Sequence, residues 1–111
     1  MEQSELNRVS VAAQIRIEDV RLIKERGYQV IINNRPDGEV ESQPASDQVK
    51  IEAEAFGLTY FYIPISPSGI TQENIDDTLG VLETTSGPVL AYCRTGNRSG
   101  VIMEALKNDL S

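Results

Sequence analysis

The chain has 111 residues, a length typical of one domain, and we expect residues 1–111 to form a single domain. Hydrophobic residues make up 40% and charged residues 24% of the sequence, which is typical of globular proteins and excludes disordered or fibrous chains. Seventeen acidic side chains against ten basic ones leave a formal charge of −7, which disfavours nucleic acids and anionic membrane surfaces as partners.

Two residue types narrow the chemistry further. The sequence contains no histidine, which removes the commonest metal ligand and every Ser–His or Cys–His catalytic pair. Its single cysteine, Cys93, cannot form an internal disulfide, and the sequence shows neither a signal peptide nor an apolar run of about 20 residues. We therefore expect a reduced, cytoplasmic protein that needs no metal and no cofactor.

Four short runs rich in β-branched and aromatic residues predict strands at 9–11, 29–32, 59–65 and 88–92. The segments between them have helical spacing, which is typical of connections between parallel strands. The predicted order is a strand followed by a helix, four times over. This order indicates an α/β fold with a mainly parallel central sheet of about four strands flanked by helices.

Start and stop signals bound the four predicted helices. The first is centred on Val20 and ends at Gly27, the second is capped by Ser46 and ends at Gly57, the third is capped by Thr71 and ends before Ser86, and the last opens near Ser99. The strands 29–32 and 88–92 are apolar throughout, so we place them at the centre of the sheet. Ligands of such sheets bind at the carboxyl ends of the strands, which directs attention to the loops 33–39, 66–70 and 93–98.

The loop after the last strand predicts an anion-binding cradle. It reads Cys-Arg-Thr-Gly-Asn-Arg-Ser-Gly from Cys93 and leads directly into a helix. Backbone N–H groups of such a loop point inward, and the helix dipole adds positive potential. Gly96 allows a positive φ or a close backbone approach. We predict that this loop binds the substrate through Arg94, Thr95, Gly96 and Asn97.

Three residues of the loop are candidate catalytic groups. Cys93 beside arginines at a helix N-terminus is expected to have a lowered pKa and to act as a thiolate nucleophile without any histidine. Arg98 is expected to fold over the bound anion and pair two of its oxygens. Ser99 is expected to cap the helix, to donate to the thiolate, or both. The alternative for Cys93 is a small buried side chain that only packs.

The pattern Cys-x-x-Gly-x-Arg-Ser at 93–99 resembles the active loops of cysteine-dependent phosphatases and rhodaneses. Together with Gln14, the segment 30–39, Gln43-Pro44 and the segment 62–65, it resembles the phosphatase-like domain of the beta-lactamase-hydrolase-like protein family. The resemblance runs from about residue 9 to the end of the chain. It implies a tyrosine-phosphatase-like fold, in a family whose members are described as phosphatases and as sulfurtransferases.

Two departures from the phosphatase pattern favour sulfur chemistry. The phosphatase loop has one residue more between its cysteine and its arginine than Cys93 and Arg98 enclose, and the shorter form resembles rhodanese loops. Phosphatases of this fold also use an aspartate from the loop after an upstream strand as general acid, whereas the loop 66–70 has no carboxylate. Transfer of sulfur from a good donor needs no such acid.

The loop 33–39 follows another strand and should flank the same site. Arg35 is a candidate ligand of an anionic substrate, and Asp37 is a candidate for a displaced general acid. The alternative is that Arg-Pro-Asp-Gly simply forms a turn, with proline and Asp-Gly favouring the bend.

Three functions remain open on this evidence. The favoured hypothesis is a sulfurtransferase that carries a persulfide on Cys93 and passes the sulfur to an acceptor such as cyanide or a thiol. The second is a phosphatase that works through a cysteinyl-phosphate. The third is a noncatalytic anion-binding or redox-sensing module, which would need a partner thiol. In the first two cases the expected partner is a small anionic substrate, and the sequence does not define the oligomeric state.

Overall fold

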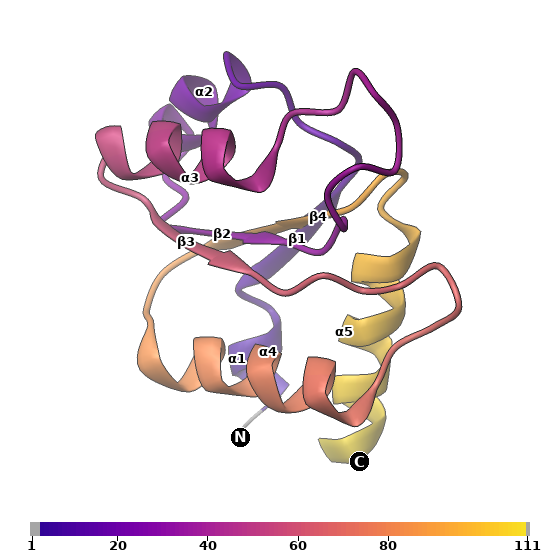
Figure 1. The fold of residues 1–111 in the computed structure, drawn as a ribbon. Helices are drawn as coiled ribbons and strands as arrows, with labels where there is room; N and C mark the ends of the chain where they lie inside the picture. Colours follow the sequence, from indigo (N-terminus) through magenta and orange to yellow (C-terminus); the bar gives the residue numbers. More distant parts are fainter. Residues whose placement is uncertain (1–2, 111) are drawn as a thin grey trace.

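The computed structural model describes residues 3–110 and contains a four-stranded sheet in which neighbouring strands are all parallel. The strands are β1 (Val9–Ala12), β2 (Val30–Asn33), β3 (Thr59–Tyr62) and β4 (Val89–Tyr92), and their order across the sheet is β1-β4-β2-β3. Figure 1 shows the strands in the middle layer of the molecule, between two layers of helices. The predicted α/β fold with a parallel central sheet is confirmed.

Helices cover both faces of this sheet. They are α1 (Gln3–Leu6), α2 (Asp19–Glu25), α3 (Ser46–Ala55), α4 (Gln72–Thr84) and α5 (Asn97–Leu110). In Figure 1, α2 and α3 lie on one face, and α1, α4 and α5 lie on the other. The four predicted helices are present, and the short α1 is an additional helix that the sequence analysis did not predict.

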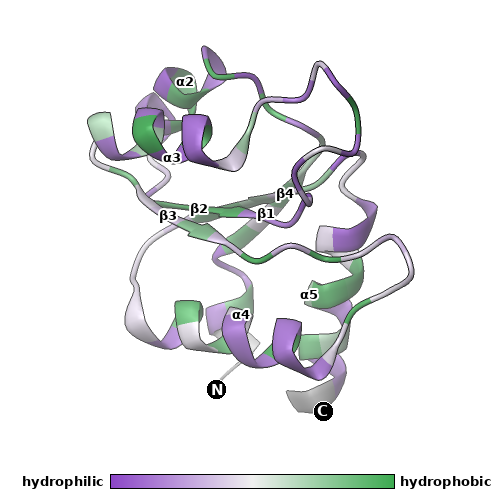
Figure 2. Cartoon of the chain, in the orientation of Figure 1, coloured by the Kyte–Doolittle hydropathy of each residue, from purple (hydrophilic) through white to green (hydrophobic). Residues whose placement is uncertain are grey.

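Each face of the sheet has its own hydrophobic core. One cluster joins β2 and β4 to α4 and α5 through residues such as Ile32, Leu82 and Ile102. The other joins the opposite face to α2 and α3 through residues such as Ile31 and Val49. All four residues of β2 and of β4 are buried, which confirms their central position, and Figure 2 shows these strands in the hydrophobic colour. The loops that follow β2 and β4 are therefore anchored at fully buried strands, which are expected to open least often.

Several element boundaries differ from the prediction, and the strand ends that differ do so mostly by one residue. Helix α3 begins at Ser46, so its cap position is Ala45, and Ser46 instead donates its backbone N–H to the Asp37 carboxylate at 2.8 Å. Helix α5 begins at Asn97, so Ser99 lies within its first turn and does not cap it. Strand β3 ends at Tyr62, before the predicted end of that strand, because the following segment contains Pro64, which has no N–H to donate.

No helix within residues 3–110 combines the length and apolar character that crossing a lipid bilayer requires.

Helix α4 offers a test of this packing at Gly80. Glycine in a helix interior costs about 1 kcal/mol relative to alanine, and a Cβ added at Gly80 would meet no heavy atom within 4 Å. We predict that Gly80→Ala raises the free energy of unfolding by roughly 0.5–1 kcal/mol, measured by urea denaturation. The matched substitution Gly96→Ala should lower it, because Gly96 has a φ of +93°. A destabilised Gly80→Ala protein would contradict this packing of α4.

Candidate active site

The cysteine lies at the point where the sheet becomes a helix. Cys93 directly follows β4 and is buried, and its backbone N–H donates to the carbonyl of Ala12 in β1 at 3.3 Å. The loop then turns at Gly96, whose φ of +93° confirms the expected left-handed conformation. A Cβ at that position would lie in ordinary van der Waals contact with the backbone of Ala12, at 3.5 Å. The cradle is therefore seated against both β4 and β1.

Backbone amides of the cradle surround the thiol. The N–H of Gly96 donates to Cys93 Sγ at 3.1 Å. Burial alone raises the pKa of the Cys93 thiol, but the backbone and side chain of Ser99 and the backbone N–H groups of Arg98 and Gly96 favour the thiolate and outweigh it. The pKa of Cys93 therefore lies below its ordinary value, as a thiolate nucleophile requires.

Arg98 is held beside the thiol by a carboxylate from another loop. Its Nη1 and Nη2 atoms donate to the two oxygens of Glu39 at 2.7 and 2.8 Å, and Nη1 also donates to the carbonyl of Ile65 at 2.9 Å. Such a two-pronged pair fixes both the position and the plane of the guanidinium. The Cys93 thiolate adds a further favourable interaction with Arg98. The loops after β2, β3 and β4 thus meet at one guanidinium.

Arg35 also pairs with the Glu39 carboxylate. Only 4% of Arg35 is exposed, and its Nε donates to Glu39 Oε1 at 3.0 Å while Nη1 donates to Gln14 Oε1 at 3.0 Å. Hydrogen bonds from Arg98 outweigh the effect of burial and, together with those from Arg35, lower the pKa of Glu39 to about 2. Glu39 is therefore ionised at neutral pH. The predicted contact of Arg35 with substrate stays a prediction, and the interactions of Arg35 in the structure are with Gln14 and Glu39.

Ser99 connects the cradle helix to the loop after β2. Its hydroxyl donates to Asn34 Oδ1 at 2.8 Å, and the Asn34 amide donates to the carbonyl of Ile63 at 2.9 Å. The backbone N–H of Asn34 donates to the carbonyl of Tyr92 at 2.7 Å, just before the cysteine. Both Ser99 and Asn34 are buried. This chain of bonds fixes the first turn of α5 relative to the thiol.

The remaining predicted residues of the loop lie at its surface. Arg94, Thr95 and Asn97 are exposed, and Thr95 Oγ accepts the backbone N–H of Asn97 at 3.3 Å. That bond satisfies an amide at the start of α5, a capping role that the prediction had assigned to Ser99. The substrate contacts predicted for these three residues remain predictions.

Asp37 has a structural partner that the sequence did not reveal. Its Oδ1 accepts the backbone N–H of Ser46 at the start of α3, and its own N–H donates to the Tyr62 hydroxyl at 2.9 Å. The carboxylate thus stabilises a helix N-terminus, where negative charge is favoured. The structure places Asp37 against α3 and β3, and its role as a displaced acid remains a prediction.

The sequence analysis assigned no role to three residues that hold the site together, Gln14, Asn34 and Glu39. All three belong to the segments that carry the family resemblance. A sequence signal existed for Glu39, because a glutamate four residues from Arg35 in a short loop can pair with it. Nothing local linked Glu39 to Arg98, which is 59 positions away.

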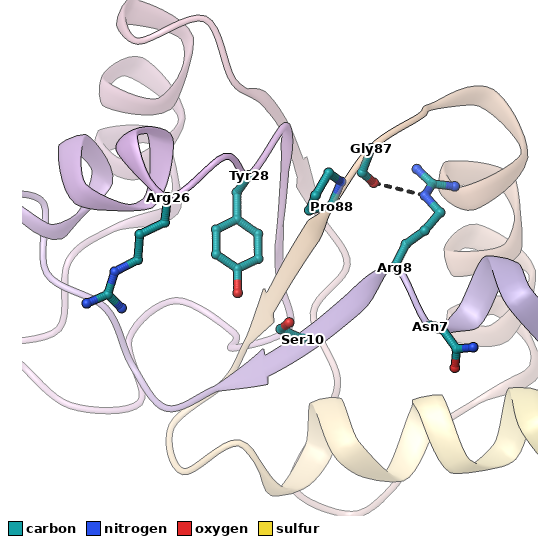
Figure 3. A pocket seen from close by; sticks show the side chains of 7 residues that line it. All are labelled: Asn7, Arg8, Ser10, Arg26, Tyr28, Gly87 and Pro88. Carbon is teal, nitrogen blue, oxygen red and sulfur yellow. Dashed lines mark hydrogen bonds between the residues drawn. The ribbon is translucent and has the colours of Figure 1, made fainter.

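A surface hollow with several polar side chains lies away from the cradle. Figure 3 shows a pocket of about 630 Å³ at the opposite, amino-terminal ends of the strands, lined by Asn7, Arg8, Ser10, Arg26, Tyr28, Gly87 and Pro88. The cradle is instead built from backbone amides around the buried Cys93. Across residues 3–110, cysteine and acidic side chains do not gather into a cluster of three that could hold a metal ion.

The role of Ser99 can be measured on the thiol itself. We predict that Ser99→Ala raises the pKa of Cys93, because it removes a polar side chain beside the thiol that favours the thiolate. The measurement is a pH titration of thiolate absorbance near 240 nm, with Cys93→Ser as the blank. Thr95→Ala is the matched control, since that hydroxyl bonds to the backbone of Asn97. An unchanged pKa in Ser99→Ala would remove Ser99 from the thiolate site.

The ion pairs of Glu39 with Arg35 and Arg98 predict how stability depends on pH. The pKa of Glu39 falls from 4.5 to about 2 on folding, so its stabilisation is complete above pH 4.5 and is lost as the pH falls toward 2. We predict that Glu39→Gln costs on the order of 3 kcal/mol at pH 7 and removes this part of the acid sensitivity. Urea denaturation at pH 7, 4 and 3 would measure both effects, with the exposed Glu41→Gln as control. Equal acid sensitivity in Glu39→Gln and the wild type would contradict the shared ion pair.

Comparison with known proteins agrees with this geometry. Residues 4–108 match the family described as the phosphatase-like domain of beta-lactamase hydrolase-like protein. A beta-lactamase hydrolase-like protein of Agrobacterium fabrum is 38% identical over 92 residues, which cover 83% of this chain and 21% of that protein. The chain thus spans about a fifth of the length of this relative.

Solved structures give the same result for the fold. A candidate phosphatase from Neisseria meningitidis superposes with a TM-score of 0.80 at 33% identity, over 89% of this chain and 70% of that one. The core catalytic domain of a PP-IP phosphatase from S. cerevisiae gives a TM-score of 0.68 at 16% identity, over 91% of this chain and 60% of that one, a likeness of fold alone. The fold is tyrosine-phosphatase-like, as the sequence predicted. The chain belongs to the family of phosphatase-like domains of beta-lactamase hydrolase-like proteins.

Proposed function

We propose that this domain is a cysteine-dependent phosphatase that hydrolyses small phosphomonoesters through a cysteinyl-phosphate on Cys93. The observation that carries the proposal is the set of backbone amides around a thiol of lowered pKa, with Arg98 fixed beside it. Family membership and the phosphatase described from Neisseria meningitidis support this activity better than the sulfur transfer that the sequence analysis favoured.

The reaction divides into two displacements at phosphorus. In the first, the Cys93 thiolate attacks, an S–P bond forms and the P–O bond to the leaving group breaks. In the second, water attacks the phosphoryl group, the S–P bond breaks, and the proton of the water passes to solvent as inorganic phosphate and the thiolate are released. Amide N–H groups of the cradle and the guanidinium of Arg98 stabilise the oxygens that carry charge in both transition states.

The state of the two carboxylates near the site determines which leaving groups the proposed reaction can use. Glu39, with a pKa of about 2, holds no proton at neutral pH, and Asp37 accepts a hydrogen bond from the N-terminus of α3. In the proposed reaction neither carboxylate protonates the departing oxygen. We therefore propose aryl phosphates and other esters whose leaving group departs as a stable anion as the substrate class, because a positioned acid otherwise contributes about 10²–10⁴-fold.

The second candidate is the sulfur transfer favoured by the sequence. The specific observation in its favour is that Cys93 and Arg98 enclose one residue fewer than a phosphatase loop, with cradle amides directed at the sulfur itself. In this reaction the Cys93 thiolate attacks the outer sulfur of thiosulfate, the S–S bond breaks and sulfite departs. The persulfide left on Cys93 then yields its sulfur to a thiolate or cyanide.

One experiment separates the two activities. Reduced wild type and Cys93→Ser are incubated with phenyl phosphate, with release of phenol recorded, and separately with thiosulfate, with the intact mass recorded. We expect phenol release by the wild type that falls at least about a hundredfold in Cys93→Ser. Arg98→Lys keeps the charge but loses the planar fork, and should lose at least about tenfold.

The opposite pattern would reject the proposal. Addition of one sulfur atom to the wild type but not to Cys93→Ser, with no release of phenol, would establish the sulfur carrier. Neither product, with Cys93 oxidised by dilute peroxide, would favour the redox-sensing alternative, in which the thiol reports oxidation without turnover.

A further inference from the structure

We propose that the open edge of strand β1 is a dimerisation surface at which two copies of this chain pair their sheets. Strand β1 ends the sheet order β1-β4-β2-β3, so one side of its backbone has no neighbouring strand. The carbonyls of Arg8 and Ala12 accept N–H groups of the β4 side, from Val89 and Cys93. Backbone groups alternate along a strand, so those of Val9 and Val11 point away from β4 toward the open edge.

This edge is short, at four residues, but it lacks two other features that block pairing. Its sequence, Val-Ser-Val-Ala, contains neither proline nor lysine. The side chain of Val11 is 41% exposed, and Leu22 on the adjoining α2 is 45% exposed. An unprotected edge strand with apolar side chains beside it is a template for another strand.

Grooves flank the edge on both faces of the sheet. The α2 groove, of about 330 Å³, is lined by Ser10, Ala12 and the apolar side chains of Ile15, Leu22 and Ile23. The α5 groove, of about 350 Å³, is lined by Val9, Val11, Met103 and Glu104. Added strands bind through main-chain hydrogen bonds and through pockets for alternate side chains. Pockets on both faces are what an added strand requires.

The edge is complementary to itself. A second copy placed antiparallel about a two-fold axis at Val11 pairs Val11 with its own copy and Val9 with Ala13. In each of these pairs the N–H and C=O groups of both residues point toward the other copy, so they can form the hydrogen bonds of an antiparallel ladder. The remaining opposed pair, Ser10 with Ala12, consists of small side chains that leave room for the partner.

Charge also favours a second copy as the partner. One end of α2 keeps a net negative charge through Glu18, because Asp19 there pairs with Arg16 at 3.2 Å. The other end keeps a net positive charge through Lys24 and Arg26, because Glu25 between them pairs with Arg21 at 3.1 Å. Figure 3 places Arg26 near Tyr28 and Ser10, at the amino-terminal end of the strands. An antiparallel copy brings the basic end of each α2 to the acidic end of the other, with the exposed Leu22 side chains between them. This is the isologous arrangement expected of a two-fold dimer.

The test is the mass of the chain in solution. We would use sedimentation equilibrium in about 0.15 M salt. Salt at this concentration screens charges more than about 8 Å apart, so repulsion between two copies of charge −7 does not prevent dimerisation. From about 1 µM to 1 mM, the range of weak pairs, we expect the wild-type mass to rise from 12.2 kDa toward twice that value. A constant 12.2 kDa, or species larger than a dimer, would overturn the proposal.

Two variants and a matched control locate the interface. Val11→Lys and Leu22→Lys should each weaken dimerisation at least about tenfold. A lysine at Val11 blocks pairing of the edge strand, and a lysine at either position lies close to the same lysine of the second copy across the two-fold axis. Ile51→Lys makes the same change on α3, at a side chain that is 70% exposed and does not line either groove, and should dimerise like the wild type. Loss of dimer in Ile51→Lys, or an unchanged dimer in both edge variants, would reject this surface.

Hydrogen exchange gives a readout that does not depend on any variant folding. In the wild type, exchange of the Val9 and Val11 amides should slow at least about tenfold between dilute and concentrated samples, because these N–H groups face the proposed partner. The Ser10 and Ala12 amides, which face β4, should show little change. Equal behaviour of the two sets would contradict pairing through the β1 edge.

Discussion

A single carboxylate fixes the geometry of the candidate active site. Glu39 is shared by Arg98 and Arg35, with donor–acceptor distances between 2.7 and 3.0 Å. Without it, two guanidinium groups would approach each other in a largely buried place, and that arrangement costs several kcal/mol unless a counter-charge is present. Glu39 cancels one of the two positive charges. The other remains to attract an anion to the cradle, in a protein whose net charge of −7 would otherwise repel it.

The sheet fixes the position of the cradle, as Glu39 fixes the position of Arg98. Amides can lower the pKa of Cys93 only if α5 starts at a fixed place relative to β4, and the bond from Ser99 to Asn34 sets that place. Asn34 directly follows β2, which is the neighbour of β4 in the sheet. The buried central strands β2 and β4 thus fix the first turn of α5, whose amides favour the Cys93 thiolate.

The fold and the cradle could be predicted because their signals are local. Apolar runs marked β2 and β4, and the order Cys-x-x-Gly-x-Arg-Ser after a buried strand identified Cys93, Gly96 and Arg98. The contacts that hold the site could not be predicted in the same way. The pairing of Glu39 with Arg98 spans 59 positions and exists only once the loops after β2 and β4 lie side by side. Likewise, Asp37 looked free in the sequence because its partner, the N–H of Ser46, belongs to a helix boundary that the sequence misplaced by one residue.

These structural roles of the acidic residues explain what the site can and cannot do. The loop 33–39 supplies two carboxylates, and each is engaged: Glu39 by two arginines, and Asp37 by the start of α3. In the proposed reaction a site arranged in this way strengthens the nucleophile and the anion-binding group and supplies no proton to a leaving atom. Its chemistry therefore favours groups that depart as stable anions, such as a phenolate or a sulfite. Phosphoryl transfer and sulfur transfer share that requirement at Cys93. The difference between them rests on whether a cradle one residue shorter than the phosphatase loop can surround a tetrahedral phosphoryl group.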